Sequence, residues 1–122
     1  MGPVGHGVSV PPVRRPESLR YRAFRGSDVV RRGLLTANDL RGPAWRRLFP
    51  DVYADAALEV THARRARAAA SVLLPHSVVS GVSAAVLWGV DDRATADSAV
   101  ELTVPPGTAR TTCAGVVVRR RV

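Results

Sequence analysis

The sequence predicts an α+β fold. Residues 34–54 have the pattern of a short capped helix followed by a tight β-hairpin, and another helix signal with a glycine turn directly precedes them. Positive charge is concentrated here: residues 13–47 contain ten arginines and three acidic residues, whereas residues 48–113 contain five arginines and seven acidic residues. These observations predict a winged helix-turn-helix at residues 17–56 and a helical and β-hairpin extension at residues 57–122, although any compact α+β domain can contain two short helices and a hairpin.

Residues 1–16 are predicted to form a flexible arm, because they contain four prolines and three glycines without hydrophobic periodicity. Arg14 and Arg15 in this arm could enter a DNA minor groove, as basic arms of other DNA-binding domains do. The alternative is an ordinary solvated tail.

Two short helices are expected next. Ser27-Asp28 is an N-cap signal for the first, and Gly33 is placed to end it in the left-handed conformation. Thr36 is a favourable N-cap for the second, and Asp39 three residues later completes a capping-box pattern. Gly42-Pro43 ends this helix, because proline disfavours helical geometry in the residue before it and lacks an N–H donor.

The hairpin follows at once. Two β-prone runs, residues 45–49 and 52–54, flank a proline–aspartate pair that favours a turn. Consecutive Arg46 and Arg47 are expected to leave opposite faces of the strand. Arg47 is expected to be the stronger phosphate contact. This expectation assumes that Arg47 lies on the face of the strand opposite to Trp45, whose indole should face the core.

Residues 61–74 carry the longest helix signal, which Pro75 ends. Alanine and leucine form one stripe and Arg64, Arg67 and Ser71 another, so the helix is expected to pack closely on its apolar side. The arginines at 64, 65 and 67 either extend the basic surface or are simply solvated. His62 is expected to be a surface or capping residue.

In the remaining sequence, a helix is expected to end near Trp88, and this tryptophan is expected to lie in the core. Asp91 and Asp92 are expected in a solvated loop rather than a metal site, because adjacent carboxylates on extended backbone point apart. The last two β-prone runs, residues 99–104 and 115–120, are expected to form one hairpin.

The sequence contains no recognisable catalytic motif. There is no phosphate-binding glycine loop, no HExxH and no G-x-S-x-G, and Cys113 has no evident base near it. The absence of lysine excludes a nuclease site of the carboxylate–carboxylate–lysine kind within these residues. We therefore predict a protein that is not an enzyme, with no cofactor and no metal site.

The net charge of +8 instead indicates a polyanionic partner, double-stranded DNA. A single cysteine permits no internal disulfide, and no apolar run approaches the length of a membrane span, so a cytoplasmic location without membrane contact is expected. The predicted DNA-binding residues lie around the second helix and the hairpin; they are Thr36, Asn38, Arg41, Arg46, Arg47, Arg31 and Arg32.

Three segments of the chain also carry a family resemblance. They are VVRRGLL…LRGPAWRRLFPDVYA, THARRARAAASVLLPHSVVSGVSAAVLWGV and VELTVPPGTAR…GVVVRR, which together cover roughly residues 20–121. They are similar to the N-terminal half of actinobacterial proteins related to the AbiEi antitoxins, in many of which a domain similar to very-short-patch-repair endonucleases follows. The resemblance implies DNA binding by the winged helix and, for true AbiEi proteins, repression of their own operon and neutralisation of a nucleotidyltransferase toxin.

The resemblance implies that the DNA-facing positions of the family correspond here to Arg41, Arg46 and Arg47. The chain departs from the family pattern at Gly81, where relatives usually have histidine, and it stops at Val122, before the rest of the second module, so nuclease activity is not transferred. The prediction is therefore an antitoxin-type transcriptional autoregulator. The alternatives are a protein-interaction module that binds a toxin or its own copies, and the DNA-targeting fragment of a split or degraded endonuclease.

Overall fold

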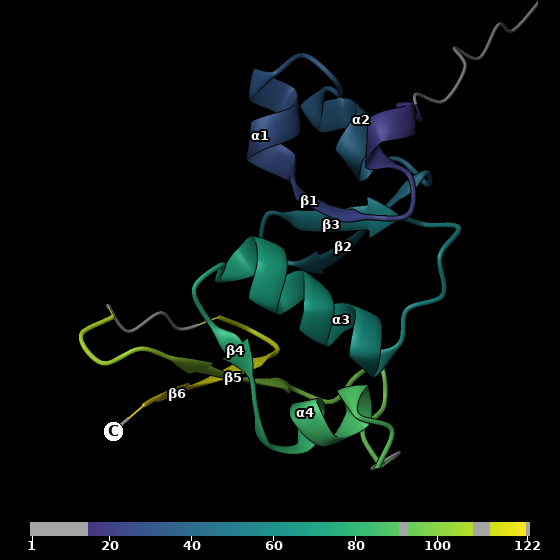
Figure 1. Ribbon diagram of the computed structural model, residues 1–122. Helices are drawn as coiled ribbons and strands as arrows, with labels where there is room; N and C mark the ends of the chain where they lie inside the picture. Colours follow the sequence, from purple (N-terminus) through teal and green to yellow (C-terminus); the bar gives the residue numbers. More distant parts are fainter. Residues whose placement is uncertain (1–14, 91–92, 109–112, 122) are drawn as a thin grey trace, which may run out of the picture.

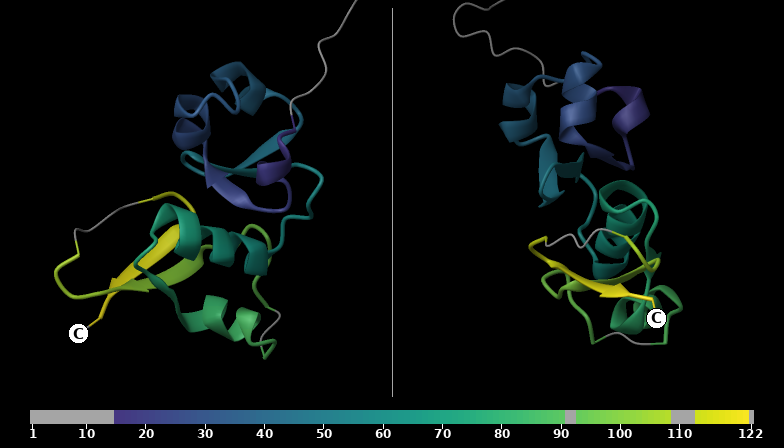
Figure 2. Two further views of the ribbon diagram at one scale, coloured as in Figure 1. Left: turned by 45° about the horizontal axis from the view of Figure 1, so that its top comes forward. Right: turned by 90° about the vertical axis from the view of Figure 1, so that its left-hand side faces the viewer.

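The computed structural model describes residues 15–90, 93–108 and 113–121, and it confirms the α+β class. A central helix lies between two small three-stranded sheets (Figure 1). This helix, called the central helix below, consists of α3 (His62–Ala68) and its π-helical continuation η2 (Ala69–Leu73). Two short helices cover the first sheet at one end of the molecule, and a third lies beside the second sheet at the other end (Figures 1 and 2).

The first sheet is built from the N-terminal part of the chain. A single 3-10 turn, η1, precedes β1, and two helices then lead into a hairpin; the bounds are η1 Glu17–Leu19, β1 Ala23–Arg25, α1 Gly26–Arg31, α2 Ala37–Arg41, β2 Trp45–Phe49 and β3 Val52–Asp55. The strand order is β1-β3-β2, with both pairs antiparallel. The hairpin predicted from sequence is therefore confirmed.

The predicted cap of α2 is also confirmed. The Thr36 hydroxyl accepts from the Asp39 N–H at 3.0 Å, and the Asp39 carboxylate accepts from the Thr36 N–H at 2.9 Å. Gly33 adopts a φ of 75° and ends the preceding helical segment as expected. The helix itself is short because Gly42, its C-cap residue, is already extended.

The predicted cap of α1 is wrong. The helix begins at Gly26, and the carboxylate of Asp51 takes the place of a local cap by accepting from the Ser27 N–H at 2.8 Å and the Ser27 hydroxyl at 2.5 Å. Asp51 lies in the β2–β3 turn, 24 residues away, and holds a φ of 60°. The hairpin turn and the start of α1 therefore stabilise each other, which no pattern within the helix could indicate.

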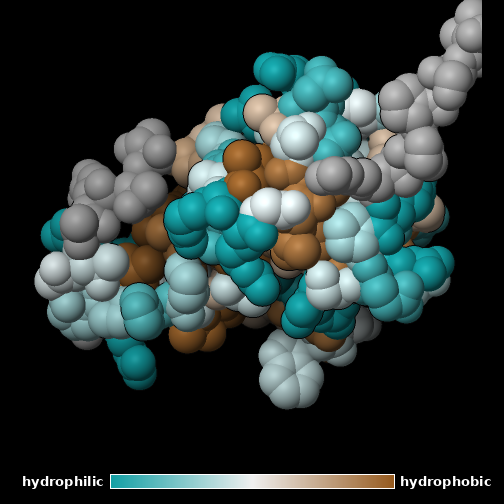
Figure 3. Space-filling view, turned by 90° about the horizontal axis from the view of Figure 1, so that it is seen from above, coloured by the Kyte–Doolittle hydropathy of each residue, from teal (hydrophilic) through white to brown (hydrophobic). Residues whose placement is uncertain are grey.

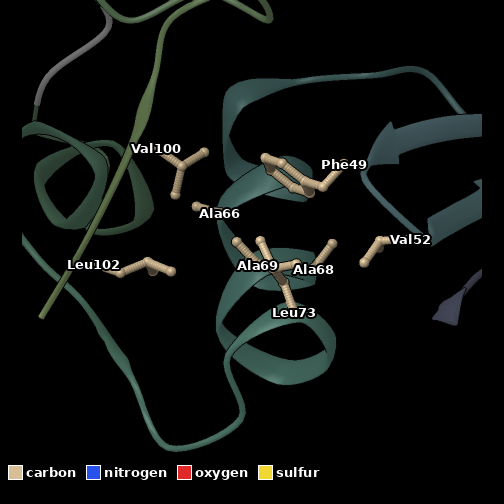
Figure 4. Packing of buried hydrophobic residues seen from close by; sticks show 8 residues of the cluster. All are labelled: Phe49, Val52, Ala66, Ala68, Ala69, Leu73, Val100 and Leu102. Atoms are coloured by element: carbon tan, nitrogen blue, oxygen red, sulfur yellow. The ribbon is translucent and has the colours of Figure 1, made fainter. Parts of the chain in front are cut away.

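The central helix supplies the main core. Its small side chains Ala66 and Ala69 are fully buried, and Leu73 completes the buried stripe. Phe49 and Val52 of the first sheet pack on one side and Val100 and Leu102 of the second sheet on the other (Figure 4). The close packing predicted from the alanine content of residues 61–74 is confirmed, and the helix is covered on two sides.

The second sheet contains β4 (Val78–Val79), β5 (Val100–Val104) and β6 (Val116–Arg120). Strand β4 is antiparallel to β5, whereas β5 and β6 are parallel, from Val100 opposite Val116 to Val104 opposite Arg120. The two last strands lie side by side in both views of Figure 2. The predicted hairpin is therefore wrong, because the long connection returns the chain to the same end of the sheet before β6 begins.

The predicted burial of Trp88 is also wrong. Helix α4 (Gly81–Leu87) turns the fully buried Ser83 toward the rest of the protein, and Trp88 follows its last residue with 83% of its surface exposed. Val90, two residues later, is 78% exposed. The apolar residues that follow this helix therefore form an exposed patch and are not part of the core.

The N-terminal arm falls almost wholly outside the described residues, which begin at Arg15. The Arg15 guanidinium forms an ion pair with the buried carboxylate of Asp55 at 3.0 Å, so this residue belongs to the folded part of the chain. Within the described ranges, no helix has both the length and the apolar character needed to cross a bilayer.

We expect Trp88→Ala to change the free energy of unfolding by no more than about 0.5 kcal/mol, the usual range for an exposed site. Leu102→Ala should instead cost about 2–5 kcal/mol, because it empties a fully buried position between the central helix and the second sheet. Chemical denaturation of both variants checks the contrast. A large loss for Trp88→Ala would mean that its side chain is buried in solution.

Candidate nucleic-acid interface

The face of α2 that points away from the sheet carries polar and basic side chains. Leu40 is buried against the first sheet, whereas Asn38 and Arg41 are exposed. Thr36 is exposed as well, but its hydroxyl is occupied by the helix cap. Asn38 and Arg41 are therefore the predicted site residues of this helix whose side chains remain available to a ligand.

The register of the first sheet places Arg46 on the side of the central helix. Arg46 lies opposite Ala54, and Ala54 lies opposite Ala23 on the next strand. Residues directly opposite each other in an antiparallel sheet share a face. Val52, two residues before Ala54, is buried against the central helix, so the row that includes Arg46 faces the same way.

Arg47 belongs to the other face. It lies opposite Tyr53, which lies opposite Phe24, and the rings of Tyr53 and Phe24 stack on the side of α1 and α2 with centroids 6.4 Å apart. Trp45 faces the core as predicted, with its ring 5.3 Å from that of Phe24. The prediction that Arg47 lies on the face of β2 opposite to Trp45 is wrong. One residue separates the two, so the alternation of side chains along the strand places them on the same face.

The arginines of α2 and β2 differ from those at the end of α1 in whether they have acidic partners. Among the described residues, none forms an ion pair or hydrogen bond with the side chains of Arg41, Arg46 or Arg47, and all three are exposed. Arg31 and Arg32 both pair with the carboxylate of Asp28, the latter at 3.6 Å. The uncompensated positive charge of the predicted site therefore lies on α2 and β2.

The structure brings together part of the predicted set. Helix α2 packs on β2, so Asn38, Arg41 and Arg47 lie on one side of the first sheet, while Arg46 faces the central helix. Seen from the side of α1 and α2, the surface has hydrophobic side chains near its centre and hydrophilic ones around them (Figure 3).

A second polar cluster lies in the interior between the central helix and α4. His62 is 4% exposed, and its Nε2 lies 2.7 Å from the Ser83 hydroxyl, while its Nδ1 lies 3.1 Å from the Thr95 carbonyl. A carbonyl only accepts, so Nδ1 carries the proton and Nε2 accepts from the hydroxyl. The prediction that His62 is a surface or capping residue is wrong.

This serine–histidine pair has no catalytic geometry. Ser83 is completely buried, and its oxygen also accepts from the Glu101 N–H at 2.9 Å. A nucleophile must reach its substrate, and this hydroxyl is enclosed and fully hydrogen-bonded. The cluster instead fixes the position of α4 against the central helix and β5.

Arg65 is the other buried polar residue of the central helix. Its guanidinium donates to the Ser98 carbonyl at 2.5 Å and lies over the Phe49 ring, 5.1 Å from the centroid. Burial lowers the pKa of Arg65 from its usual value, and the nearby charge of Asp97 raises it by less. Of the three arginines predicted as a possible basic surface on this helix, Arg64 and Arg67 are exposed and Arg65 is structural.

Gly81 begins α4 with a φ of 57°. A Cβ atom at this position would lie 1.5 Å from Oε2 of Glu101, whose carboxylate accepts from the Val82 N–H at 2.9 Å and so caps the helix. The glycine thus leaves room for a carboxylate cap at the start of α4.

No metal site is evident in the described part of the chain, because no three histidine, cysteine, aspartate or glutamate residues there lie together in a way that could hold a metal ion. Asp91 and Asp92, which were expected in a solvated loop, lie outside the described residues. Sequence reasoning missed the buried roles of His62, Arg65 and Ser83. The partners of His62 are 21 and 33 residues away, so no local pattern signals them.

Ser83→Ala is expected to cost about 1–3 kcal/mol of stability, because it leaves both His62 Nε2 and the Glu101 N–H buried without a partner. Ser71→Ala is the matched control, since Ser71 is exposed and its hydroxyl bonds only to its own helix. Thermal and urea unfolding give both values. Equal stabilities of the two variants would contradict the structural role of the cluster.

Gly81→Ala should destabilise the protein by at least about 1 kcal/mol, the approximate cost of a left-handed residue with a Cβ. Gly89→Ala separates the two contributions, because Gly89 also has a positive φ, 75°, but nothing lies within 4 Å of its Cβ position. The excess loss at Gly81 then measures the displaced Glu101 carboxylate. If Gly89→Ala costs as much as Gly81→Ala, that carboxylate contributes nothing measurable to the helix.

Comparison of the chain with known protein families, curated proteins and solved structures found no match. The relationship to AbiEi-like proteins therefore stays a prediction from the three sequence segments quoted above.

Proposed function

We propose that residues 17–56 form a winged helix-turn-helix that binds double-stranded DNA without catalysing a reaction. The order η1, β1, α1, α2, β2, β3 and the strand order β1-β3-β2 support this proposal. In helix-turn-helix domains the second helix enters the major groove. Here that helix is α2, joined to α1 by the turn at Gly33, and the β2–β3 hairpin is the wing.

The observation that carries the proposal is the exposed and unpaired charge of Arg41 and Arg47. Both lie on the side of the first sheet that α1 and α2 occupy, and the described residues provide neither with an acidic partner. Guanidinium groups form two parallel hydrogen bonds to phosphate, which suits them to hold a hairpin against a DNA backbone. Asn38 is the residue of α2 proposed to reach a base edge.

Within this proposal, the sequence segments shared with AbiEi-like proteins favour an antitoxin-type autoregulator. The partner in that case is a nucleotidyltransferase toxin. A second candidate is a protein-interaction module, which the exposed Trp88 and Val90 favour, because large exposed apolar residues close together often mark contact surfaces. The two candidates differ in which end of the molecule carries the function.

The test is a mobility-shift titration with a short duplex at about 50 and 200 mM salt. Affinity should fall steeply as salt rises, and Arg41→Ala combined with Arg47→Ala should lower the slope of the log–log plot by about two, one for each lost phosphate contact. Arg47→Ala should weaken binding more than Arg46→Ala, because Arg46 faces the central helix. All variants should retain the melting temperature of the natural protein within the range usual for surface changes.

Arg120→Ala is the matched control, since Arg120 is exposed on β6 in the second sheet. It removes the same charge far from the proposed interface and should leave the slope nearly unchanged. No duplex binding at the lower salt concentration would refute the DNA-binding proposal. Loss of binding to the same degree in Arg120→Ala and Arg47→Ala would show that net charge, rather than this surface, attracts DNA.

A further inference from the structure

We propose that the groove between the first sheet and the central helix binds a small amphipathic anion, a medium-chain aliphatic carboxylate. This groove contains a cavity of about 690 Å³ that is open to solvent. Its walls come from η1, β1, α1, the hairpin, the segment before α3 and the central helix itself. The volume lies within the range of about 300–1,000 Å³ that is usual for small-molecule sites.

The cavity exists because small side chains face each other across the groove. Ala23 and Ala54 form one row of the sheet, and Ala68 faces them from the central helix. These methyl groups fill less of the space at this end of the interface than larger side chains would, whereas Phe49, Val52 and Leu73 close the other end. Leu48 and Val72 extend the apolar lining. An aliphatic chain is the kind of group that such a lining accepts.

The charge at the same cavity is positive and largely uncompensated. Arg46, Arg64 and Arg67 line it, and no carboxylate among the described residues forms an ion pair with any of them. Three acidic residues line the cavity: Asp55 pairs with Arg15, Asp28 pairs with Arg31 and Arg32, and Glu59 is exposed. Arg64 already donates to the Glu59 carbonyl at 3.0 Å, so an anionic group would find its available guanidinium donors on Arg46 and Arg67.

These two features select the ligand. A purely apolar molecule would leave the arginine side chains without a partner, and a small hydrophilic anion would leave the apolar lining exposed to water. A molecule with one carboxylate and an aliphatic tail satisfies both, with its head group on Arg46 and Arg67. The carboxylate also reduces the mutual repulsion of the arginines that border the cavity.

The proposal goes beyond DNA binding and does not depend on it. Arg46 faces the cavity, whereas the proposed DNA contacts Arg41 and Arg47 lie on the opposite side of the first sheet. A bound ligand touches both the first sheet and the central helix, so it should stabilise their packing. By mass action, ligand that binds only the folded protein raises the melting temperature.

Calorimetric titration of the full chain with sodium decanoate, below the concentration at which it forms micelles, tests the proposal. Decanoate should bind at a single site and raise the melting temperature, while acetate and decan-1-ol, which lack the tail and the charge respectively, should bind far more weakly. Arg46→Gln combined with Arg67→Gln should weaken decanoate binding at least about tenfold, the effect of losing charge-assisted hydrogen bonds. Arg120→Gln should not change it.

A second variant tests the proposal independently in case the double arginine variant does not fold. Ala54→Val keeps a residue suited to a strand and fills part of the cavity without altering charge, so it should also weaken decanoate binding. No binding of decanoate would overturn the proposal, as would unchanged affinity in both variants or equal binding of decan-1-ol. DNA binding measured in parallel fails or succeeds independently, because the proposed DNA contacts Asn38, Arg41 and Arg47 do not line the cavity.

Discussion

The structure depends on one helix whose small side chains allow close packing on two sides. Ala66 and Ala69 are completely buried, and the two sheets approach the central helix closely there because each alanine presents only a methyl group. Neither three-stranded sheet has another apolar layer on that face, so each needs the helix to bury its hydrophobic side chains. A larger residue at either alanine would push the sheets apart and weaken both halves of the core.

Buried and half-buried arginines then tie the layers together. Arg25 of the first sheet donates to the Leu73 carbonyl at the end of the central helix, at 2.9 Å, and Arg65 donates from that helix to the Ser98 carbonyl. Arg15 pairs with the buried Asp55. Part of the positive charge thus serves packing and is not available to a polyanion. Net charge alone therefore overstates the surface that could bind one.

The two arginines of β2, which have no acidic partner among the described residues, lie on opposite faces of the first sheet. Alternation along β2 sends Arg47 toward the side of α2 and Arg46 toward the central helix, so one pair of consecutive residues contributes to two different surfaces. The proposed DNA interface and the proposed carboxylate site follow from this division. Each uses one exposed guanidinium group of β2 that has no acidic partner among the described residues.

The sequence by itself determined the features that depend on neighbouring residues: the capping box of Thr36 and Asp39, the hairpin, and the inward indole of Trp45. It also indicated that Arg41, Arg46 and Arg47 lie at the surface, but it assigned Arg47 to the wrong face of β2. Only the tertiary structure decided the distant Asp51 cap of α1, the parallel pairing of the last strands, the exposure of Trp88 and the burial of His62. These features depend on contacts between residues 16 or more positions apart or on which side of an element is covered, and local propensity contains no information about either.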